Sequence, residues 1–535
     1  MDLSRESSNY TIFSALVAEA ERHLQASHFT AAAVYAQIAS AFAMLNHADI
    51  FVSPRLERIA RHIGCALLGA DSETPPDRPR RGARPIIHVA TQVFGIGGHT
   101  RMIWRWLEQD RAHTHIVALT RQGPEPLPRR LRAAAEASGG SLVRLDARPG
   151  SLIARARALR RLARTGEIVV LHINPYDIVP LIAFADRRNL PPIALLNHTD
   201  HLFGLGVSTA DLYVNQRESG AQLALTRRGV ADERLALLPI VVPQPSRSMQ
   251  RSEAKRRLGL PPDSLLLLSI ARAEKYVPLS GSRAYLNDLV LPHAALPVLH
   301  RFPQAHLFVV GPPHTGAWEA AAEATGGRVR AFGSRPDTAL FYQAADVYLD
   351  SFPFTSITSL LEAGSYGTPL VGCFPYGAGA RVLCADTPAL RRTMIGATTS
   401  AEYHAAIERL LADAAYRAEM GALAAQGIAR DHSGAGWQRW LSMTYSRALE
   451  VPAHDGSPPC DEYRQPSELD ALLHDLYSGD GALDGLTAAN VQLLPPGLRL
   501  RLWLELAQQT HRLRLRLLFP EWLASQILRL VARPA

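Results

Sequence analysis

The chain has 535 residues, of which 47% are apolar and 20% are charged. This composition is typical of globular proteins with large cores, and the length predicts more than one domain. It excludes a disordered chain, a collagen-like chain and a small disulfide-stapled protein. The net charge is +8, and the positive charges are almost all arginine, because Lys255 and Lys275 are the only lysines. A charge this modest gives no reason to expect a nucleic-acid partner.

The cysteines and the termini bear on where the protein works. Cys65, Cys373, Cys384 and Cys460 form no C-x-x-C pair and show no metal-ligand spacing. The first residues lack the basic start and apolar core of a secretory signal. No apolar run approaches the roughly 18 residues of a membrane helix. We therefore expect a reduced, cytoplasmic protein without a bound metal.

Residues 1–70 are predicted to be helical. Apolar residues recur at helical spacing in three stretches of this region, around Leu16, Ile38 and Ile59. Residues 71–84 are rich in proline and arginine, which is typical of a linker.

Residues 85–245 and 246–450 then alternate short apolar runs with helical patterns. Runs that are apolar throughout predict parallel strands covered on both faces. The chain is therefore predicted to contain two tandem α/β, Rossmann-like domains, followed by a linker at 451–466 and a mainly helical extension at 467–535. Ligands of such sheets bind at the carboxyl ends of the strands, so the cleft between the two domains is the expected site. The predicted strands are 86–90, 116–119, 142–145, 168–173, 193–196, 212–214, 235–238, 265–270, 307–310, 329–332, 347–349 and 370–371.

Two motifs follow predicted strands of the first α/β domain. Gly97 and Gly98 follow its first strand and open a helix, where free N–H groups attract an anion; a tight strand-to-helix turn is the simpler alternative. His198, Asp200 and His201 follow its fifth strand. They suit acid/base chemistry near neutral pH, while a metal site or a plain polar loop would fit the same residues.

Two further motifs follow predicted strands of the second α/β domain. Arg272 and Lys275 follow its first strand and could clamp a diphosphate together. Asp350 ends a later strand, and a cluster of hydroxyls then meets a helix N-terminus, which favours phosphate binding. Glu362 lies on that helix and could bind two ribose hydroxyls, although Ser359 to Glu362 also fits a helix capping box. The hydroxyl cluster is Thr355, Ser356, Thr358 and Ser359.

On these motifs, residues 85–450 resemble the GT-B glycosyltransferases, which use nucleotide sugars. Gly97-Gly98 is similar to the donor-side loop of their first domain, Arg272 and Lys275 to the basic pair at the donor diphosphate, and Glu362 to the second glutamate of their E-x7-E motif. Phe354 stands where the first glutamate would fall. In this respect the run from Asp350 to Phe354 is more similar to O-GlcNAc transferase and its inverting relatives.

The resemblance implies a metal-independent glycosyltransferase, of the hexosyltransferase class, with a UDP-sugar as co-substrate and no further cofactor. Lys275 and Arg272 would neutralise the departing diphosphate, the hydroxyl cluster would bind its oxygens, and Glu362 would bind the ribose. His198 would be the base of an inverting reaction, and His99 and Asp200 would lie on the acceptor side, where a glycan or a protein enters. A sugar-nucleotide epimerase and a non-catalytic interaction protein are the alternatives.

The C-terminal extension contains a leucine- and arginine-rich stretch at 498–517. Its alternation fits strands, but its composition favours helix. Such a helix either packs on its own domain or lies on an anionic membrane with Trp503 and Trp522 at the surface. Peripheral membrane contact through this tail on the cytoplasmic face is therefore an open alternative.

Overall fold

The computed structural model describes residues 3–68, 84–95, 97–245, 247–459, 464, 466–477 and 483–531. Most of the predicted linker at 71–84, part of the one at 451–466, and Cys460 lie outside these residues. The described residues form two compact units, one from 1–216, 220–238 and 442–535 and the other from 217–219 and 239–441. Each unit contains one parallel sheet with helices around it, which confirms the predicted α/β class with two sheets.

The sheet of the first unit has seven parallel strands in the order β3-β2-β1-β4-β5-β6-β7. Strands β1, β4 and β5 are buried along their whole length, as continuous apolar runs predict for strands covered on both faces. The strand order changes direction between β1 and β4, which makes their carboxyl ends the switch point of this sheet. The bounds are β1 Ile86–Ala90, β2 His115–Leu119, β3 Ser141–Arg144, β4 Ile168–His172, β5 Ile193–Asn197, β6 Leu212–Asn215 and β7 Leu235–Leu237.

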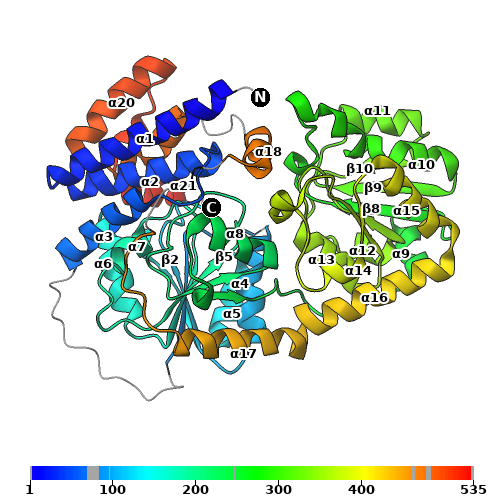
Figure 1. The fold of residues 1–535 in the computed structure, drawn as a ribbon, viewed down its shortest axis with the longest axis horizontal. Helices are drawn as coiled ribbons and strands as arrows, with labels where there is room; N and C mark the ends of the chain where they lie inside the picture. Colours follow the sequence, from blue (N-terminus) through cyan, green and yellow to red (C-terminus); the bar gives the residue numbers. More distant parts are fainter. Residues whose placement is uncertain are drawn as a thin grey trace. The chain divides into compact units, whose positions relative to one another are not determined.

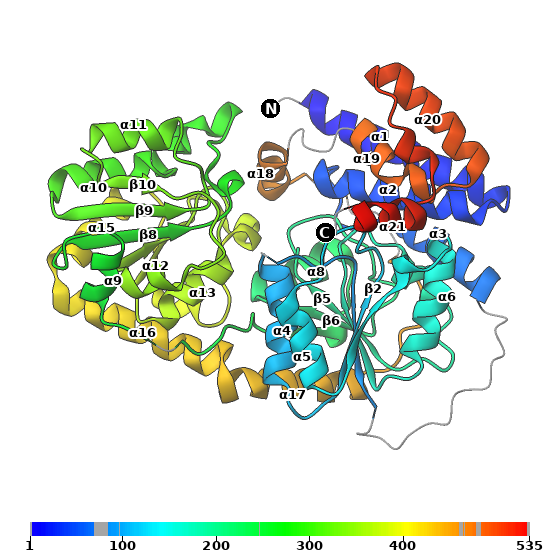
Figure 2. The same ribbon diagram turned by 180° about the vertical axis from the view of Figure 1, so that it is seen from behind.

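Helices cover both faces of this first sheet. Figure 1 shows α4 and α5 on one side and α3, α6 and α7 on the other, and the view from behind in Figure 2 agrees. The helices between the strands of this unit, together with α17 at its later boundary, are α4 Gly98–Gln109, α5 Arg129–Ala137, α6 Leu152–Ala163, α7 Val179–Ala183, α8 Glu218–Arg228 and α17 Gly434–Glu450.

The N-terminal helices share a core with this sheet. They are α1 Leu3–Gln25, α2 Phe29–Leu45 and α3 Pro54–Leu68, close to the three predicted stretches. Phe13 and Val34 belong to the same buried cluster as Val169 of β4. Helix α3 approaches α7 so closely that a Cβ on Gly64 would lie 2.3 Å from the carbonyl oxygen of Ile182. The N-terminal helices are therefore part of the first unit's core.

The C-terminal helices also belong to the first unit. Glu521 begins α21, and its carboxylate accepts hydrogen bonds from Arg121 and Arg155 at 2.6 Å each. Although burial opposes it, these two guanidinium charges lower the pKa of Glu521 to about 2. Gln37 on α2 donates to Asn490 at 2.9 Å, so both ends of the chain are joined in one unit. The helices are α18 Glu468–Leu476, α19 Leu483–Asn490, α20 Pro496–Thr510 and α21 Glu521–Val531.

The predicted helix for the leucine- and arginine-rich stretch is only half right. Residues 498–503 lie in α20, but His511 adopts the left-handed backbone conformation (φ 51°) and ends it. A short 3-10 turn, Leu515–Leu518, follows. Within the described residues, no helix has both the length and the apolar character needed to cross a membrane.

The sheet of the second unit has six parallel strands in the order β10-β9-β8-β11-β12-β13, so its switch point lies between β8 and β11. The sequence misses β13, because its run Met394–Ala397 is short and partly exposed. The bounds are β8 Leu265–Ile270, β9 Ala305–Val310, β10 Val329–Ala331, β11 Val347–Leu349, β12 Leu370–Cys373 and β13 Met394–Ala397. The helices are α9 Arg251–Arg257, α10 Leu296–Arg301, α11 Ala317–Ala324, α12 Ala339–Ala344, α13 Ile357–Ser365, α14 Leu390–Thr393, α15 Ser400–Ala412 and α16 Ala414–His432.

Candidate functional site

The switch point of the second sheet carries the residues that the sequence singles out. Lys275 lies just after β8, on the 3-10 turn Ala273–Tyr276, and Asp350 follows β11 directly. Strands β8 and β11 are hydrogen-bonded neighbours, so the two side chains emerge beside each other. The Asp350 charge is close enough to act on the pKa of Lys275.

Asp350 organises the loop that leads from β11 to α13. One carboxylate oxygen accepts from the backbone N–H groups of Ser351 (2.8 Å) and Ser356 (2.9 Å), and the other accepts from the Thr355 hydroxyl. Burial raises the pKa of Asp350 to about 6, although these hydrogen bonds and the Lys275 charge oppose the rise. The carboxylate therefore holds residues 350–356 in one conformation.

Lys275 lies against this loop. Its Nζ donates to the carbonyl oxygen of Thr355 at 2.6 Å and lies 4.6 Å from the centre of the Phe354 ring, a cation–π contact. Burial lowers the pKa of Lys275 to about 8. The positions of Lys275 and Phe354 are thus coupled.

Two arginines add to the positive charge around Lys275. Arg272 and Arg217 both lower its pKa through their charges, whereas Asp350 opposes them. The Arg272 side chain is 80% exposed and lies 3.4 Å from Glu274. Arg217 is buried and donates to the carbonyl oxygen of Cys384. We call Lys275, Arg272 and Arg217 the cation cluster; the buried carboxylate beside Lys275 is Asp350.

Helix α13 begins beside the cation cluster. Its N-cap is Ser356, so Ser359 is the third helical residue and Glu362 the sixth. The capping-box alternative for Ser359 and Glu362 is therefore wrong, because the helix starts one turn earlier than that alternative requires. Glu362 is buried and accepts from the Tyr342 hydroxyl at 3.1 Å.

The hydroxyl cluster falls into two groups. Thr355 and Ser356 are buried, and their hydroxyls are used within the loop: that of Thr355 donates to Asp350, and that of Ser356 donates to Ser359 at 3.2 Å. Thr358 and Ser359 lie on the partly exposed first turn of α13. A ligand at this end of the sheet would therefore meet the first turn of the helix before it meets Thr355.

The switch point of the first sheet carries the glycine loop. Gly97 has a φ of 119°, which favours glycine, and it is the N-cap of α4. A Cβ on Gly97 would meet no atom within 4 Å, and Gly98 is exposed. The backbone at the start of α4 is therefore open to a ligand.

Two imidazoles lie beside that loop. The rings of His99 and His198 stack with their centres 4.2 Å apart, and His99 Nε2 donates to the carbonyl oxygen of His172, the last residue of β4, at 2.7 Å. Burial lowers the pKa of both rings, and the neighbouring His99 and His172 help to hold that of His198 well below its ordinary range. Both rings are therefore neutral at physiological pH.

The other two polar residues of this motif are turned to different partners. Asp200 is buried, and a Cβ on Gly220 of α8 would lie 2.5 Å from its carboxylate oxygen. His201 Nε2 lies 2.7 Å from the Tyr477 hydroxyl, at the end of α18. Among the described residues, the one cluster with metal-ligand geometry includes neither His198 nor His201.

No family model matches the sequence, and no curated protein is similar to it in sequence. The structure is similar to that of HepE from Anabaena in complex with UDP (15% identity, TM-score 0.52, covering 68% of this chain and 99% of HepE). It is similar to HepE in complex with UDP and glucose (16%, 0.50, 67% and 99%) and to a glycosyltransferase from Rickettsia africae (12%, 0.50, 69% and 100%). The chain has the GT-B fold. At these identities the similarity concerns the fold.

Two polar residues of this GT-B chain escape sequence reasoning. The sequence places Asp350 at the end of a strand but assigns it no role, although that place is a usable signal. Arg217 lies two residues after β6 and directly before α8, in the run Asn215-Gln-Arg-Glu-Ser. Its approach to Lys275 depends on long-range packing, and nothing local in the sequence predicts it.

Proposed function

We propose that this chain is a glycosyltransferase that moves a sugar from a nucleotide diphosphate sugar to an acceptor. The observation that carries the proposal is the cation cluster at the switch point of the second sheet. It brings the charges of Arg272 and Arg217 to bear on Lys275, which lies beside the buried Asp350 and the start of a nine-residue helix. Positive charge next to the N-terminus of a helix favours an anion, and a diphosphate has the size and charge to contact both.

The donor would be held by residues of the second unit. Lys275 and Arg272 would neutralise the charge that develops on the departing diphosphate, so this task needs no metal ion. Thr358, Ser359 and the N–H groups of the first turn of α13 would bind phosphate oxygens. Glu362 would accept hydrogen bonds from the ribose. Thr355 and Ser356 would act through the shape of the loop that Asp350 fixes.

Residues of the first unit would serve the acceptor, and Gly97 and Gly98 would bind the donor. In an inverting reaction, the acceptor oxygen attacks the anomeric carbon, the bond to the diphosphate breaks, and a base takes the acceptor proton. A neutral imidazole can be that base, and His198 is neutral because burial lowers its pKa. His99 would hold the His198 ring by stacking, and Asp200 would position the start of α8. In a retaining reaction, His198 would orient the sugar.

A UDP-hexose is the donor that we propose. The support is that the structures of Anabaena HepE contain UDP, in one case together with glucose, and share this chain's fold. The acceptor would be a glycan or a protein.

A thermal-shift screen against nucleotide diphosphates and their sugars tests the proposal. A ligand at 100 times its dissociation constant adds about 2.7 kcal/mol of stability, which is easily detected. We expect UDP or a UDP-sugar to raise the unfolding midpoint and the purified chain to hydrolyse that donor slowly. An epimerase would convert the donor sugar without acceptor, and a non-catalytic interaction protein would leave the donor unchanged.

We also propose that the C-terminal segment makes peripheral contact with anionic lipid. Leu500, Leu504, Leu513 and Leu515 are exposed by 47–75%, and Arg512 and Arg514 are exposed beside them. This mixture of exposed leucine and arginine suits the boundary of a membrane. Trp503 packs against the core instead. Co-sedimentation with phosphatidylglycerol vesicles should fall when Leu513 and Leu515 are both changed to serine; equal binding by the two proteins would argue against the contact.

A further inference from the structure

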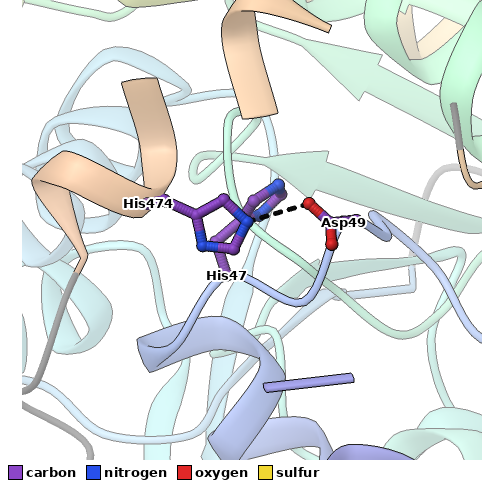
Figure 3. Close-up of side chains that lie close together, drawn as sticks. All are labelled: His47, Asp49 and His474. Atoms are coloured by element: carbon purple, nitrogen blue, oxygen red, sulfur yellow. Dashed lines mark hydrogen bonds and ion pairs between the residues drawn. The ribbon is translucent and has the colours of Figure 1, made fainter. Parts of the chain in front are cut away.

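The structure brings together two histidines and an aspartate that are far apart in the sequence. His47 and Asp49 lie in the segment between α2 and α3, and His474 lies on α18, more than 400 residues later (Figure 3). One nitrogen or oxygen of each side chain lies within 4.8 Å of those of the other two. His47 and Asp49 are buried, and His474 is half-buried. We propose that His47, Asp49 and His474 bind one zinc ion.

The distances suit a tetrahedral metal ion. His474 Nε2 lies 2.8 Å from Asp49 Oδ1, and the two imidazole rings meet nearly edge to face with their centres 5.0 Å apart. Zinc binds nitrogen and oxygen at about 2.0–2.2 Å, which puts two tetrahedral ligand atoms about 3.4 Å apart. The three side chains can reach that separation by small rotations. Figure 3 shows them turned toward one another.

A second ring of interactions fixes the state of His47. Its Nε2 lies 2.8 Å from Asp470 Oδ1, and Arg227 donates to both oxygens of that carboxylate, at 3.0 and 3.1 Å. A carboxylate bound by a guanidinium only accepts hydrogen bonds, so His47 Nε2 carries the proton and Nδ1 carries the lone pair. A carboxylate behind a ligand histidine is a common partner in zinc sites. The nitrogen of His47 that is left to bind a metal ion is therefore Nδ1.

The ligand set selects the class of metal. Two imidazoles and one carboxylate suit zinc and similar borderline ions, whereas magnesium and calcium prefer sites made only of oxygen. The sequence predicts no metal because it shows no metal-ligand spacing of cysteines or histidines. His47 and Asp49 show no such spacing with His474, which lies more than 400 residues later.

The site would tie α18 to the N-terminal helices. The same end of α18 carries Tyr477, whose hydroxyl lies 2.7 Å from His201 on the loop that also carries His198. A zinc ion would therefore stabilise the packing of α18 and, through it, that loop. It would do so without contact with any reacting group, and a water molecule would take the fourth tetrahedral position of the ion.

The test uses the full chain, prepared without a polyhistidine tag and freed of metal with a chelator. We expect calorimetry to give one zinc ion per chain, and saturating zinc to raise the unfolding midpoint by about 5 °C. Magnesium should do neither. His474→Ala should weaken zinc binding by at least about 100-fold and abolish the rise in the midpoint. His300→Ala, an exposed histidine of the second unit, is the matched control and should behave as the unchanged chain.

Asp49→Asn separates a metal site from a plain hydrogen-bonded contact. The asparagine carbonyl still accepts from His474 Nε2, so a structural hydrogen bond would survive, but the charged ligand is lost. We expect this variant to fold and to lose most of its zinc affinity. Zinc binding that is absent from the unchanged chain, or that persists undiminished in both Asp49→Asn and His474→Ala, would overturn the proposal.

Discussion

The two sheets of this chain end in different chemistry, although both are parallel and both change strand order near their middle. At the switch point of the second sheet, Lys275 lies beside Asp350, and the charges of Arg272 and Arg217 act on Lys275. At that of the first sheet, His99 and His198 stack on each other, and burial lowers the pKa of both. One end is positively charged and the other is neutral.

This difference indicates what each end can bind. The lowered pKa of Lys275 reflects both burial and its cationic neighbours, and an anion bound there would stabilise the charge of Lys275. Neutral imidazoles attract no anion, but each offers one lone pair and can take a proton from a hydroxyl group. A charged donor would bind at the end of the second sheet, and a neutral acceptor at the end of the first sheet.

The largest effect is expected from the neutral end. In His198→Asn the base is lost, and general-base catalysis is worth about 100- to 10,000-fold, so transfer to an acceptor should fall by that factor. Hydrolysis of the donor by water and binding of UDP should change far less. Rates of transfer and hydrolysis measured on one preparation check this, with His300→Asn as the control. Transfer within about 5-fold of the unchanged chain would remove His198 from the chemistry.

The charged end gives the next effect. Lys275→Ala should slow the chemical step by about 100- to 1,000-fold, by analogy with the loss of one donor to a developing anion. Single-turnover kinetics with saturating donor measure that step. Arg392→Ala, an exposed arginine of the same unit, is the matched control. The control should react at the rate of the unchanged chain. If Lys275→Ala also reacted at that rate, the cation cluster would have no part in the reaction.

Glu362 sharpens the comparison within the second unit. Glu362→Gln should weaken UDP binding by about 10- to 150-fold, because a hydrogen bond to a charged group is worth about 1.5–3 kcal/mol. Tyr342→Phe removes the hydroxyl that Glu362 accepts from but keeps the carboxylate, so it should cost less. Calorimetric titration of both variants decides between them. Unchanged affinity in Glu362→Gln would leave this residue a purely structural role.

The pH dependence of UDP binding gives the smallest effect. The pKa of Lys275 is lowered to about 8, so its charge is lost as the pH rises through 8, and UDP affinity should fall by up to about 10-fold per pH unit above that. The unfolded chain keeps this proton up to its ordinary pKa, so between the two values this group's contribution to stability rises with pH. Weaker binding there would therefore not be unfolding. In Lys275→Arg the UDP affinity should not fall above pH 8, because arginine keeps its charge there. The same fall in both proteins would show that another group titrates.

The fold was largely predictable from the sequence, because buried parallel strands such as β1, β4 and β5 are apolar at every position. Strand β13 was not, since it is short and half-exposed. Lys275 and Glu362 could be found because each lies directly after a strand or on the helix that follows one. Arg217 and the pairing of His47 with His474 could not, because their partners are supplied by packing between distant segments. The start of α13 at Ser356 could not be predicted either, since Ser356 and Ser359 are equally good N-cap residues.

The central claim is that the cation cluster binds the diphosphate of a nucleotide sugar. Calorimetric titration of uridine, UMP and UDP into the unchanged chain and into Lys275→Ala tests it most directly. We predict that the unchanged chain prefers UDP over UMP by at least about 10-fold, the worth of one charge-assisted hydrogen bond, and that Lys275→Ala loses this preference while it still binds uridine. An equal preference for UDP in both proteins would contradict the claim.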